Sequence, residues 1–137
     1  MIRKSLMDII AAARKEIIDL HVLLQNWFCG EGVVEPQAIL DHFTPDYQMV
    51  GAAGRPISRE AFAGALPKLF GSRPGLVMEI EDVAVIASFK DGHLVTYKEI
   101  QTQNGNRNER WSVVMFRTGS AQQALLWQYL QETFLAI

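Results

Sequence analysis

The sequence predicts an α+β domain in which helices come first and an antiparallel sheet follows. An apolar stripe with helical spacing runs through the first thirty residues. Two hairpin signals, Asp91-Gly92 and Asn104-Gly105, divide the C-terminal half into long segments with strand character. Helices that precede a run of antiparallel strands pack together on one side of the sheet.

The first predicted helix is the clearest element of the chain. Its apolar residues recur three and four positions apart, namely Leu6, Ile9, Ile10, Ala13, Ile17, Leu20, Leu24, Trp27 and Phe28. Ser5 with Asp8 makes a weak capping box, and Gly30 and Gly32 end the helix. A helix of about 25 residues is expected to lie across a sheet.

Shorter elements follow the long helix. A second helix with Pro36 in its first turn contains Phe43 and ends at Thr44-Pro45. A short strand at 46–50 and a turn-rich link at 51–56 come next. Ser58 caps a third helix, which Pro67 is expected to kink or end early. Four strands are then predicted at 76–89, 93–103, 109–117 and 124–135.

Both faces of the last two predicted strands carry bulky residues. In the segment 110–117, Val114 and Phe116 alternate with Trp111, Val113 and Met115. In the last strand, alternation places Trp127, Tyr129 and Gln131 on one face and Leu126, Gln128, Leu130 and Glu132 on the other. Because helices can cover one face only, the exposed face predicts a homodimer formed through the sheet. The alternative is a long sheet that curls and covers itself.

Composition excludes several function classes. The 137 residues carry a net charge of −2, and the 13 basic residues are scattered, so no nucleic-acid surface is predicted. No apolar run approaches the ~20 residues that span a bilayer, and Asp8 interrupts what resembles a signal-peptide opening. The single cysteine, Cys29, fits a reducing cytoplasm and is interpreted as a structural thiol.

A polar row on one predicted strand is the candidate site. Tyr97, Glu99 and Gln101 are two residues apart and share a face. If the hairpin closes at Asn104-Gly105, Arg110 lies opposite Glu99. Inside an apolar enclosure the Glu99 carboxylate becomes desolvated and suits a general base, whereas an ion pair with Arg110 keeps it charged. These two interpretations remain open.

Other candidates have structural alternatives. Tyr97 and Tyr47 can donate hydrogen bonds to a ligand carbonyl or simply pack, and Trp27 can form the floor of a pocket or belong to the core. His21 shares the apolar stripe and is either a satisfied core residue or a catalytic group. His42 and His93 are expected to be exposed. No histidine or cysteine spacing predicts a metal site, and no glycine-rich loop predicts a phosphate-bearing cofactor.

Four segments of the chain together resemble the nuclear transport factor 2-like superfamily, which has a cystatin-like fold, and within it the small bacterial SnoaL-like branch. They are Glu16-Ile17-Ile18-Asp19-Leu20-His21, Phe43 with Asp46-Tyr47, Val95 to Gln101, and Trp127 with Gln131-Glu132-Thr133-Phe134-Leu135. The resemblance covers residues 1–137 as one domain. It implies a cone, in which a strongly curved antiparallel sheet wraps around a long N-terminal helix with two shorter helices, and a pocket at the open end.

The same resemblance implies several activities, because members include isomerases, cyclases, dehydratases and oligomerisation domains. Catalytic members carry an aspartate, or a histidine with an aspartate, on the inner wall of the cone. Where one branch usually has a histidine, this chain has Gln131, which cannot shuttle protons.

Three functional hypotheses result. The first is a domain that binds a small molecule without a cofactor, in a pocket lined by Trp27, Tyr47, Tyr97, Glu99, Gln101 and Arg110. The second is an enzyme in which Glu99 abstracts a proton next to a carbonyl while Tyr97 stabilises the oxyanion. The third is an assembly module whose sheet face is its function, with a small or filled pocket.

Overall fold

The structure is a computed structural model that describes residues 5–32, 35–119 and 124–136. Within these ranges, three helices and six strands follow one another as α1 (Leu6–Cys29), α2 (Gln37–Leu40), β1 (Phe43–Val50), β2 (Pro56–Ser58), α3 (Arg59–Leu69), β3 (Val77–Phe89), β4 (Gly92–Gln103), β5 (Asn106–Thr118) and β6 (Leu125–Phe134). The predicted order of elements is confirmed, with β2 added to it. None of the helices in the described ranges is long and apolar enough to cross a membrane.

The strands form one six-stranded sheet in the order β2-β1-β6-β5-β4-β3. All neighbours are antiparallel except β1 and β6, which are parallel. The predicted antiparallel meander of four strands is confirmed in β3 to β6, and the parallel pairing of β1 with β6 adds to it. The reason is topological, because the last strand of the chain inserts beside the first one instead of ending the meander at an edge.

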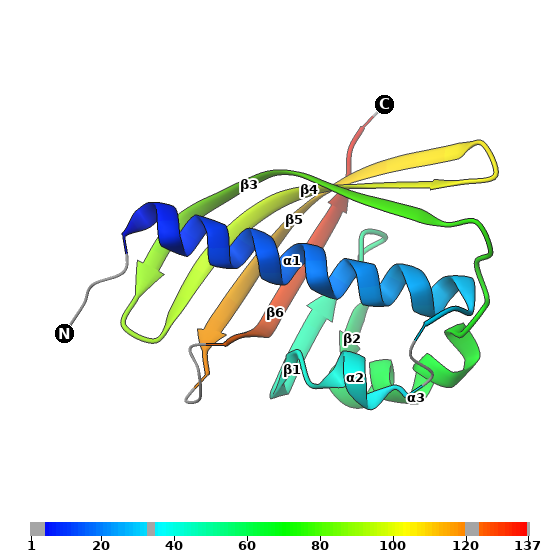
Figure 1. Cartoon of the computed structure of the whole chain (residues 1–137), viewed down its shortest axis with the longest axis horizontal. Helices are drawn as coiled ribbons and strands as arrows, with labels where there is room; N and C mark the ends of the chain where they lie inside the picture. Colours follow the sequence, from blue (N-terminus) through cyan, green and yellow to red (C-terminus); the bar gives the residue numbers. More distant parts are fainter. Residues whose placement is uncertain (1–4, 33–34, 120–123, 137) are drawn as a thin grey trace.

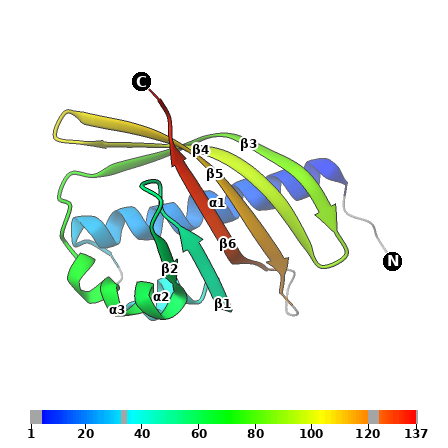
Figure 2. The same cartoon turned by 180° about the vertical axis from the view of Figure 1, so that it is seen from behind.

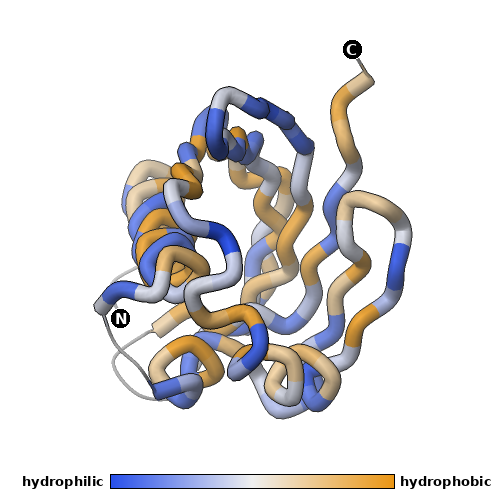
Figure 3. The backbone as a smooth tube through the Cα atoms, turned by 90° about the vertical axis from the view of Figure 1, so that its right-hand side faces the viewer, coloured by the Kyte–Doolittle hydropathy of each residue, from blue (hydrophilic) through white to orange (hydrophobic). Residues whose placement is uncertain are grey.

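The sheet curves around α1, which lies across its concave face (Figure 1). Seen from the end, α1 stands opposite the curved strands, with α2 and α3 closing one side of the space between them (Figure 3). From behind, no described helix covers the convex face of β3 to β6 (Figure 2). This arrangement is the predicted cone, and the concave side is where a pocket can form.

The sequence signals for α1 are confirmed in detail. Ser5 Oγ accepts a hydrogen bond from Asp8 N at 3.1 Å, and Asp8 Oδ2 accepts one from Ser5 N, which completes the capping box. The helix ends at Gly30, whose φ of 75° is a left-handed conformation that suits glycine. Ala13, Ile17, Leu20, His21 and Trp27 are buried. Leu6, at the start of the predicted stripe, is exposed.

The hairpin between β4 and β5 has the predicted register. Asn104 and Gly105 both have positive φ, 51° and 82°, as a type I′ turn requires. The register that follows places Glu99 opposite Arg110 and Tyr97 opposite Ser112. The row of Tyr97, Glu99 and Gln101 is therefore on the concave face, in the same layer as the core residue Val95.

One local prediction near a proline is wrong. The second helix ends at Leu40, and Phe43, Thr44 and Pro45 already belong to β1, because Pro45 holds the preceding residue in extended geometry. Pro67 lies in the last turn of α3, which ends two residues later at Leu69.

A bulge in β6 changes which side chains face the interior. Met115 is opposite Tyr129 and Phe116 is opposite Trp127, so Gln128 has no partner in the register. Because of this extra residue, Trp127 shares the concave face with Leu130 and Glu132. The predicted alternation, which put Trp127 and Glu132 on opposite faces, is corrected by this finding.

Candidate functional site

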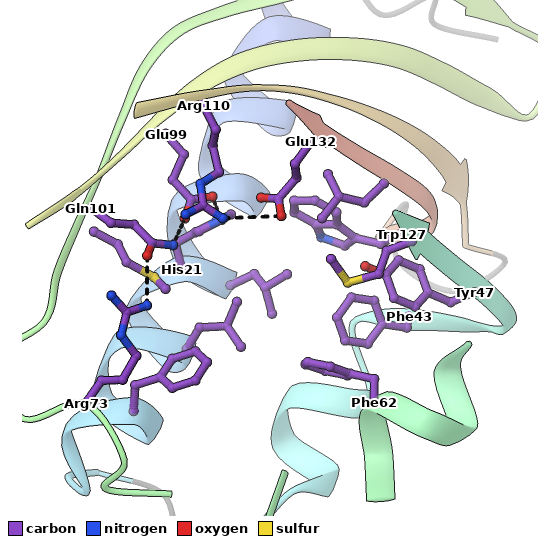
Figure 4. A pocket seen from close by; sticks show the side chains of 16 residues that line it. His21, Phe43, Tyr47, Phe62, Arg73, Glu99, Gln101, Arg110, Trp127 and Glu132 are labelled. Carbon is purple, nitrogen blue, oxygen red and sulfur yellow. Dashed lines mark hydrogen bonds and ion pairs between the residues drawn. The ribbon is translucent and has the colours of Figure 1, made fainter. Parts of the chain in front are cut away.

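A cavity of about 220 Å³ lies between α1 and the concave face of the sheet (Figure 4). Sixteen residues from α1, α3, five strands and the loop after α3 line it: Leu20, His21, Leu24, Phe28, Phe43, Tyr47, Met49, Phe62, Arg73, Met78, Glu99, Gln101, Arg110, Trp127, Leu130 and Glu132. Charged and amide side chains gather on one side of the cavity and aromatic side chains on the other (Figure 4).

The aromatic side is a packed cluster. Phe43 stacks on Tyr47 with ring centroids 4.1 Å apart, and Phe62 meets Phe43 edge-on at 5.6 Å. Trp127 contacts Phe43 edge-on at 6.5 Å. Such offset and edge-to-face pairs stabilise a rigid apolar wall. This wall can hold a flat or bulky apolar group without rearranging.

His21 and Glu99 form a hydrogen-bonded pair at the polar side. His21 Nδ1 is 2.7 Å from the backbone oxygen of Ile17, and since a carbonyl only accepts, Nδ1 carries a proton. His21 Nε2 is 2.9 Å from Glu99 Oε1. Burial lowers the pKa of His21, but the charge of Glu99 and its hydrogen bond outweigh burial and raise that pKa above its ordinary value. The pair is therefore an imidazolium bound to a carboxylate.

The second oxygen of Glu99 is also occupied. Gln101 Nε2 donates to Glu99 Oε2 at 2.6 Å, and Arg73 Nη1 donates to Gln101 Oε1 at 2.8 Å. Burial alone would raise the pKa of Glu99, but the charge and hydrogen bond of His21 and the bond from Gln101 lower it to about 2. Glu99 is only 2% exposed and stays ionised. A continuous series of hydrogen bonds thus connects the loop after α3 to α1 through β4.

Glu132 is a second carboxyl group in the same cavity, with fewer partners. Arg110 Nη1 lies 3.5 Å from Glu132 Oε1, and among the described residues no other ion pair involves Glu132. Burial, and then the negative charge of Glu99, raise the pKa of Glu132 to about 7 against the opposing charge of Arg110. The two carboxyl groups therefore differ, because Glu99 has strong donors on both oxygens and Glu132 has one distant cation.

One buried donor near these carboxyl groups lacks an acceptor. Within the described ranges, Arg110 Nε has no hydrogen-bond partner. The buried hydroxyls of Tyr97 and Ser112 are opposite each other across β4 and β5, so each is the available partner of the other. Ser112 is in turn opposite Glu132 on β6. Because buried polar groups are normally satisfied, Arg110 Nε is the unused donor of this wall.

Four of the six predicted ligand-binding residues line the cavity: Tyr47, Glu99, Gln101 and Arg110. Trp27 and Tyr97 are not among the lining residues. Trp27 Nε1 donates to the Leu66 backbone oxygen at 2.8 Å, and its ring packs on Phe70, so it belongs to the core. Tyr97 is fully buried between His21 and Trp127.

The predicted alternative of an ion pair between Glu99 and Arg110 is also corrected. The two residues are opposite in the register, but Glu99 pairs with His21 and Arg110 pairs with Glu132. His42 is not exposed as expected either, since its Nδ1 donates to Glu16 Oε2 at 2.6 Å. Among the described residues, no group of three or more histidine, cysteine or acidic side chains could hold a metal ion.

Comparison with solved structures places the fold. An NTF-2-like protein of unknown function from Pseudomonas aeruginosa is 33% identical, with a TM-score of 0.86 over 91% of this chain and 99% of that one. The chain belongs to the nuclear transport factor 2-like family. A scan against family models finds no match, and a search of curated proteins finds none.

Two less similar solved structures share this fold and carry names of different kinds. A proposed aromatic ring hydroxylase from Novosphingobium aromaticivorans is 13% identical, with a TM-score of 0.78 over 98% of this chain and 94% of that one. A proposed calcium/calmodulin-dependent kinase II association domain from Thiobacillus denitrificans is 12% identical, with a TM-score of 0.69 over 90% of this chain and 94% of that one. At these identities the likeness concerns the fold alone.

The last strand places two neighbouring residues, Gln131 and Glu132, on opposite faces of the sheet. Gln131 is exposed, opposite Val113, beside a shallow hollow on the convex face. Its neighbour Glu132 faces the cavity. Sequence reasoning did not assign a site role to Glu132 or Arg73, and it left the partner of His21 open. The histidine on the buried stripe of α1 was the one available signal.

Proposed function

We propose that this protein binds a small molecule in the cavity between α1 and the sheet. The apolar body of the ligand lies against the cluster of Phe43, Tyr47 and Phe62, and its polar end meets the charged side at Arg110 and Glu132. The observation that carries this proposal is a buried charged network facing a cavity whose other side is apolar. Buried charges are expensive, and this network is more elaborate than packing alone requires.

The size of the cavity limits the ligand. At about 220 Å³ it is smaller than the ~300–1,000 Å³ of pockets that hold drug-sized molecules. A ligand with a single ring and a short polar substituent fits this volume.

An enzyme is the second candidate, favoured by the presence of two carboxyl groups in one cavity. Glu99 is poorly suited as the base, since both of its oxygens accept hydrogen bonds and its pKa is lowered to about 2. Tyr97 lies outside the cavity lining and is unsuited to stabilise an oxyanion there. Binding without a reaction is therefore the better supported function, and an activity that survives in Glu99→Gln would exclude Glu99 as its base.

The convex face of the sheet supports a homodimer. Trp111 is 44% exposed there, and Val113, Met115 and Tyr129 are half-buried beside it. A solved structure with this fold is named as an association domain, which is consistent with assembly of such domains into oligomers.

The protein is further proposed to be cytoplasmic, because the free thiol of Cys29 fits a reducing compartment.

Blocking the cavity tests the proposed function. Leu24 on α1 lines the cavity, and Leu24→Trp adds bulk to it. Val22 is on the exposed side of the same helix, 52% exposed, so Val22→Trp is the matched control. A library of single-ring compounds is screened by ligand-observed NMR against both variants and the original protein.

We expect some single-ring compounds to bind both the original protein and Val22→Trp but not Leu24→Trp. Circular dichroism checks that both variants fold. A library without binders, or binders unaffected by Leu24→Trp, would show that the cavity is not the ligand site.

A further inference from the structure

The charged side of the cavity carries more positive than negative groups. His21, Arg73 and Arg110 face it with two carboxyl groups, Glu99 and Glu132. The protein as a whole has a net charge of −2, so the cavity differs in sign from the rest of the molecule. A low-dielectric enclosure strengthens such an imbalance, because water does not screen it. An anionic group is therefore attracted to this wall, and a cationic one is repelled.

Arg110 is the cation whose bonds are least complete. Its Nη2 donates to Asn108 Oδ1 at 2.7 Å, and its guanidinium carbon lies 4.9 Å from the centre of the Phe134 ring. The separation of 3.5 Å between Arg110 Nη1 and Glu132 is longer than the ~2.7–2.9 Å of a strong charge-assisted bond. Its Nε is buried without a partner among the described residues. Arg110 thus has donor capacity that the protein does not use.

We propose that the ligand is a small organic acid whose carboxylate binds Arg110 in place of Glu132, and that Glu132 takes up one proton from solvent as the acid binds. This inference rests on the proposed function and names the ligand class of the same cavity. Glu99 is already paired with His21, so an ionised ligand at Arg110 would bring two negative charges, its own and that of Glu132, to one guanidinium. Protonation of one of them removes that repulsion.

Glu132 is the group that can take this proton. Glu99 keeps its charge, because His21 and Gln101 donate to its two oxygens. Burial and the charge of Glu99 already raise the pKa of Glu132 to about 7. The titratable and charged groups that act on Glu132 from the surrounding elements are His21 on α1, Tyr47 on β1, Tyr97 and Glu99 on β4, and Arg110 on β5. Once protonated, Glu132 can also donate a hydrogen bond to the ligand carboxylate.

Three probes that share a phenyl ring test the ligand class: benzoate, benzyl alcohol and benzylamine. Their dissociation constants are measured by isothermal titration calorimetry from pH 6 to pH 8.5, in two buffers with different ionisation enthalpies. Benzoate is expected to bind more tightly than the other two probes. Above pH 7 its dissociation constant should rise about tenfold per pH unit, with uptake of about one proton at pH 8 and much less at pH 6.

Two variants isolate the proton. In Glu132→Gln the side chain is neutral at every pH, so benzoate should bind with little pH dependence and, at pH 8, more tightly than to the original protein. Glu79→Gln makes the same change on an exposed residue of β3 and should behave as the original protein does. If Glu132→Gln does not fold, the number of protons that the original protein takes up at pH 8 still shows whether benzoate binding is coupled to protonation.

The possible failures are distinguishable. Benzyl alcohol or benzylamine binding as tightly as benzoate, or benzoate binding without proton uptake at pH 8, would overturn the organic acid but leave a ligand cavity. Absence of binding by all three probes, or equal binding to Leu24→Trp, would remove the proposed function together with this inference.

Discussion

His21 on α1 and Glu99 on β4 are joined by a hydrogen bond of 2.9 Å that ties the helix to the middle of the sheet, across 78 positions of sequence. Since the other ring nitrogen donates to Ile17, the shared proton makes the pair an imidazolium and a carboxylate. A buried pair of this kind is costly to form and more costly to break on one side. Its two charges also act on Glu132 in the same cavity, because Glu99 raises the pKa of that residue and His21 lowers it.

Removing the carboxylate of this pair is predicted to lower the pKa of His21. In Glu99→Gln the attraction of the carboxylate is gone while burial remains, so the His21 pKa falls below its ordinary value of 6.5. Nitrogen NMR of the imidazole ring measures this change, and Glu79→Gln serves as the control. A His21 titration that is the same in Glu99→Gln would contradict the pairing. At a pH below the lowered His21 pKa, Glu99→Ala leaves the imidazolium without a partner and should lower the free energy of unfolding by about 3–5 kcal/mol.

The same pair predicts how stability depends on pH. Glu99 has a lowered pKa, so its contribution is complete above its ordinary value of 4.5 and is lost as the pH falls toward about 2. His21 has a raised pKa, so its contribution is complete below 6.5 and is lost as the pH rises through the raised value. Urea unfolding across this range should show a maximum between the two losses, and the acid loss should be smaller in Glu99→Gln.

Glu132→Gln is predicted to stabilise the protein in mild alkali. A carboxyl group with a pKa raised to about 7 binds protons more tightly in the folded state, so it lowers stability as the pH rises from about 4.5 to 7. The variant removes this loss, which is at most about 3 kcal/mol. Its melting temperature should exceed that of the original protein at pH 8 by several degrees and be similar at pH 5. A lower melting temperature at pH 8 would show that the charge of Glu132 is needed.

The pair of His42 and Glu16 is predicted to stabilise the packing of α1 against the start of β1 and against β6. Glu16 Oε2 accepts from His42 Nδ1 at 2.6 Å and from Trp127 Nε1 at 3.0 Å. The hydrogen bond to Glu16 raises the pKa of His42, so its contribution is present below 6.5 and is lost as the pH rises through the raised value. Glu16→Gln should lower the His42 pKa, measured by NMR, and change Trp127 fluorescence. Glu60→Gln, on α3, is the control.

A charge on the convex face is predicted to dissociate the proposed homodimer. Trp111→Glu places a carboxylate at the centre of the proposed interface and should weaken dimerisation about 30-fold or more. Phe89→Glu makes a similar change at the end of the edge strand β3, where the residue is 53% exposed, and should have little effect. Analytical ultracentrifugation measures both. A monomeric original protein, or equal effects of the two changes, would argue against this interface.

The sequence predicted the elements whose signals are local. The capping box at Ser5, the glycine that ends α1 and the Asn104-Gly105 turn each act within a few residues, and each is confirmed. Since that turn sets the register of β4 against β5, the sequence also placed Glu99 opposite Arg110. Local sequence signals were therefore sufficient to predict the relative positions of these two site residues.

The remaining features depend on contacts between distant segments. The bulge at Gln128 has no strong sequence signal, yet it decides that Glu132 faces the cavity together with Trp127. The partner of His21 depends on how α1 crosses the sheet, which helical periodicity does not determine. The parallel pairing of β1 with β6 depends on where the last strand inserts.

A crystal structure of the protein grown with benzoate at pH 6 tests the central claim most directly. We expect the phenyl ring of benzoate to pack against Phe43 and Phe62, and its carboxylate to lie within hydrogen-bonding distance of the Arg110 guanidinium. Benzoate bound only outside this cavity, or a cavity that stays free of the probe at saturating concentration, would contradict it.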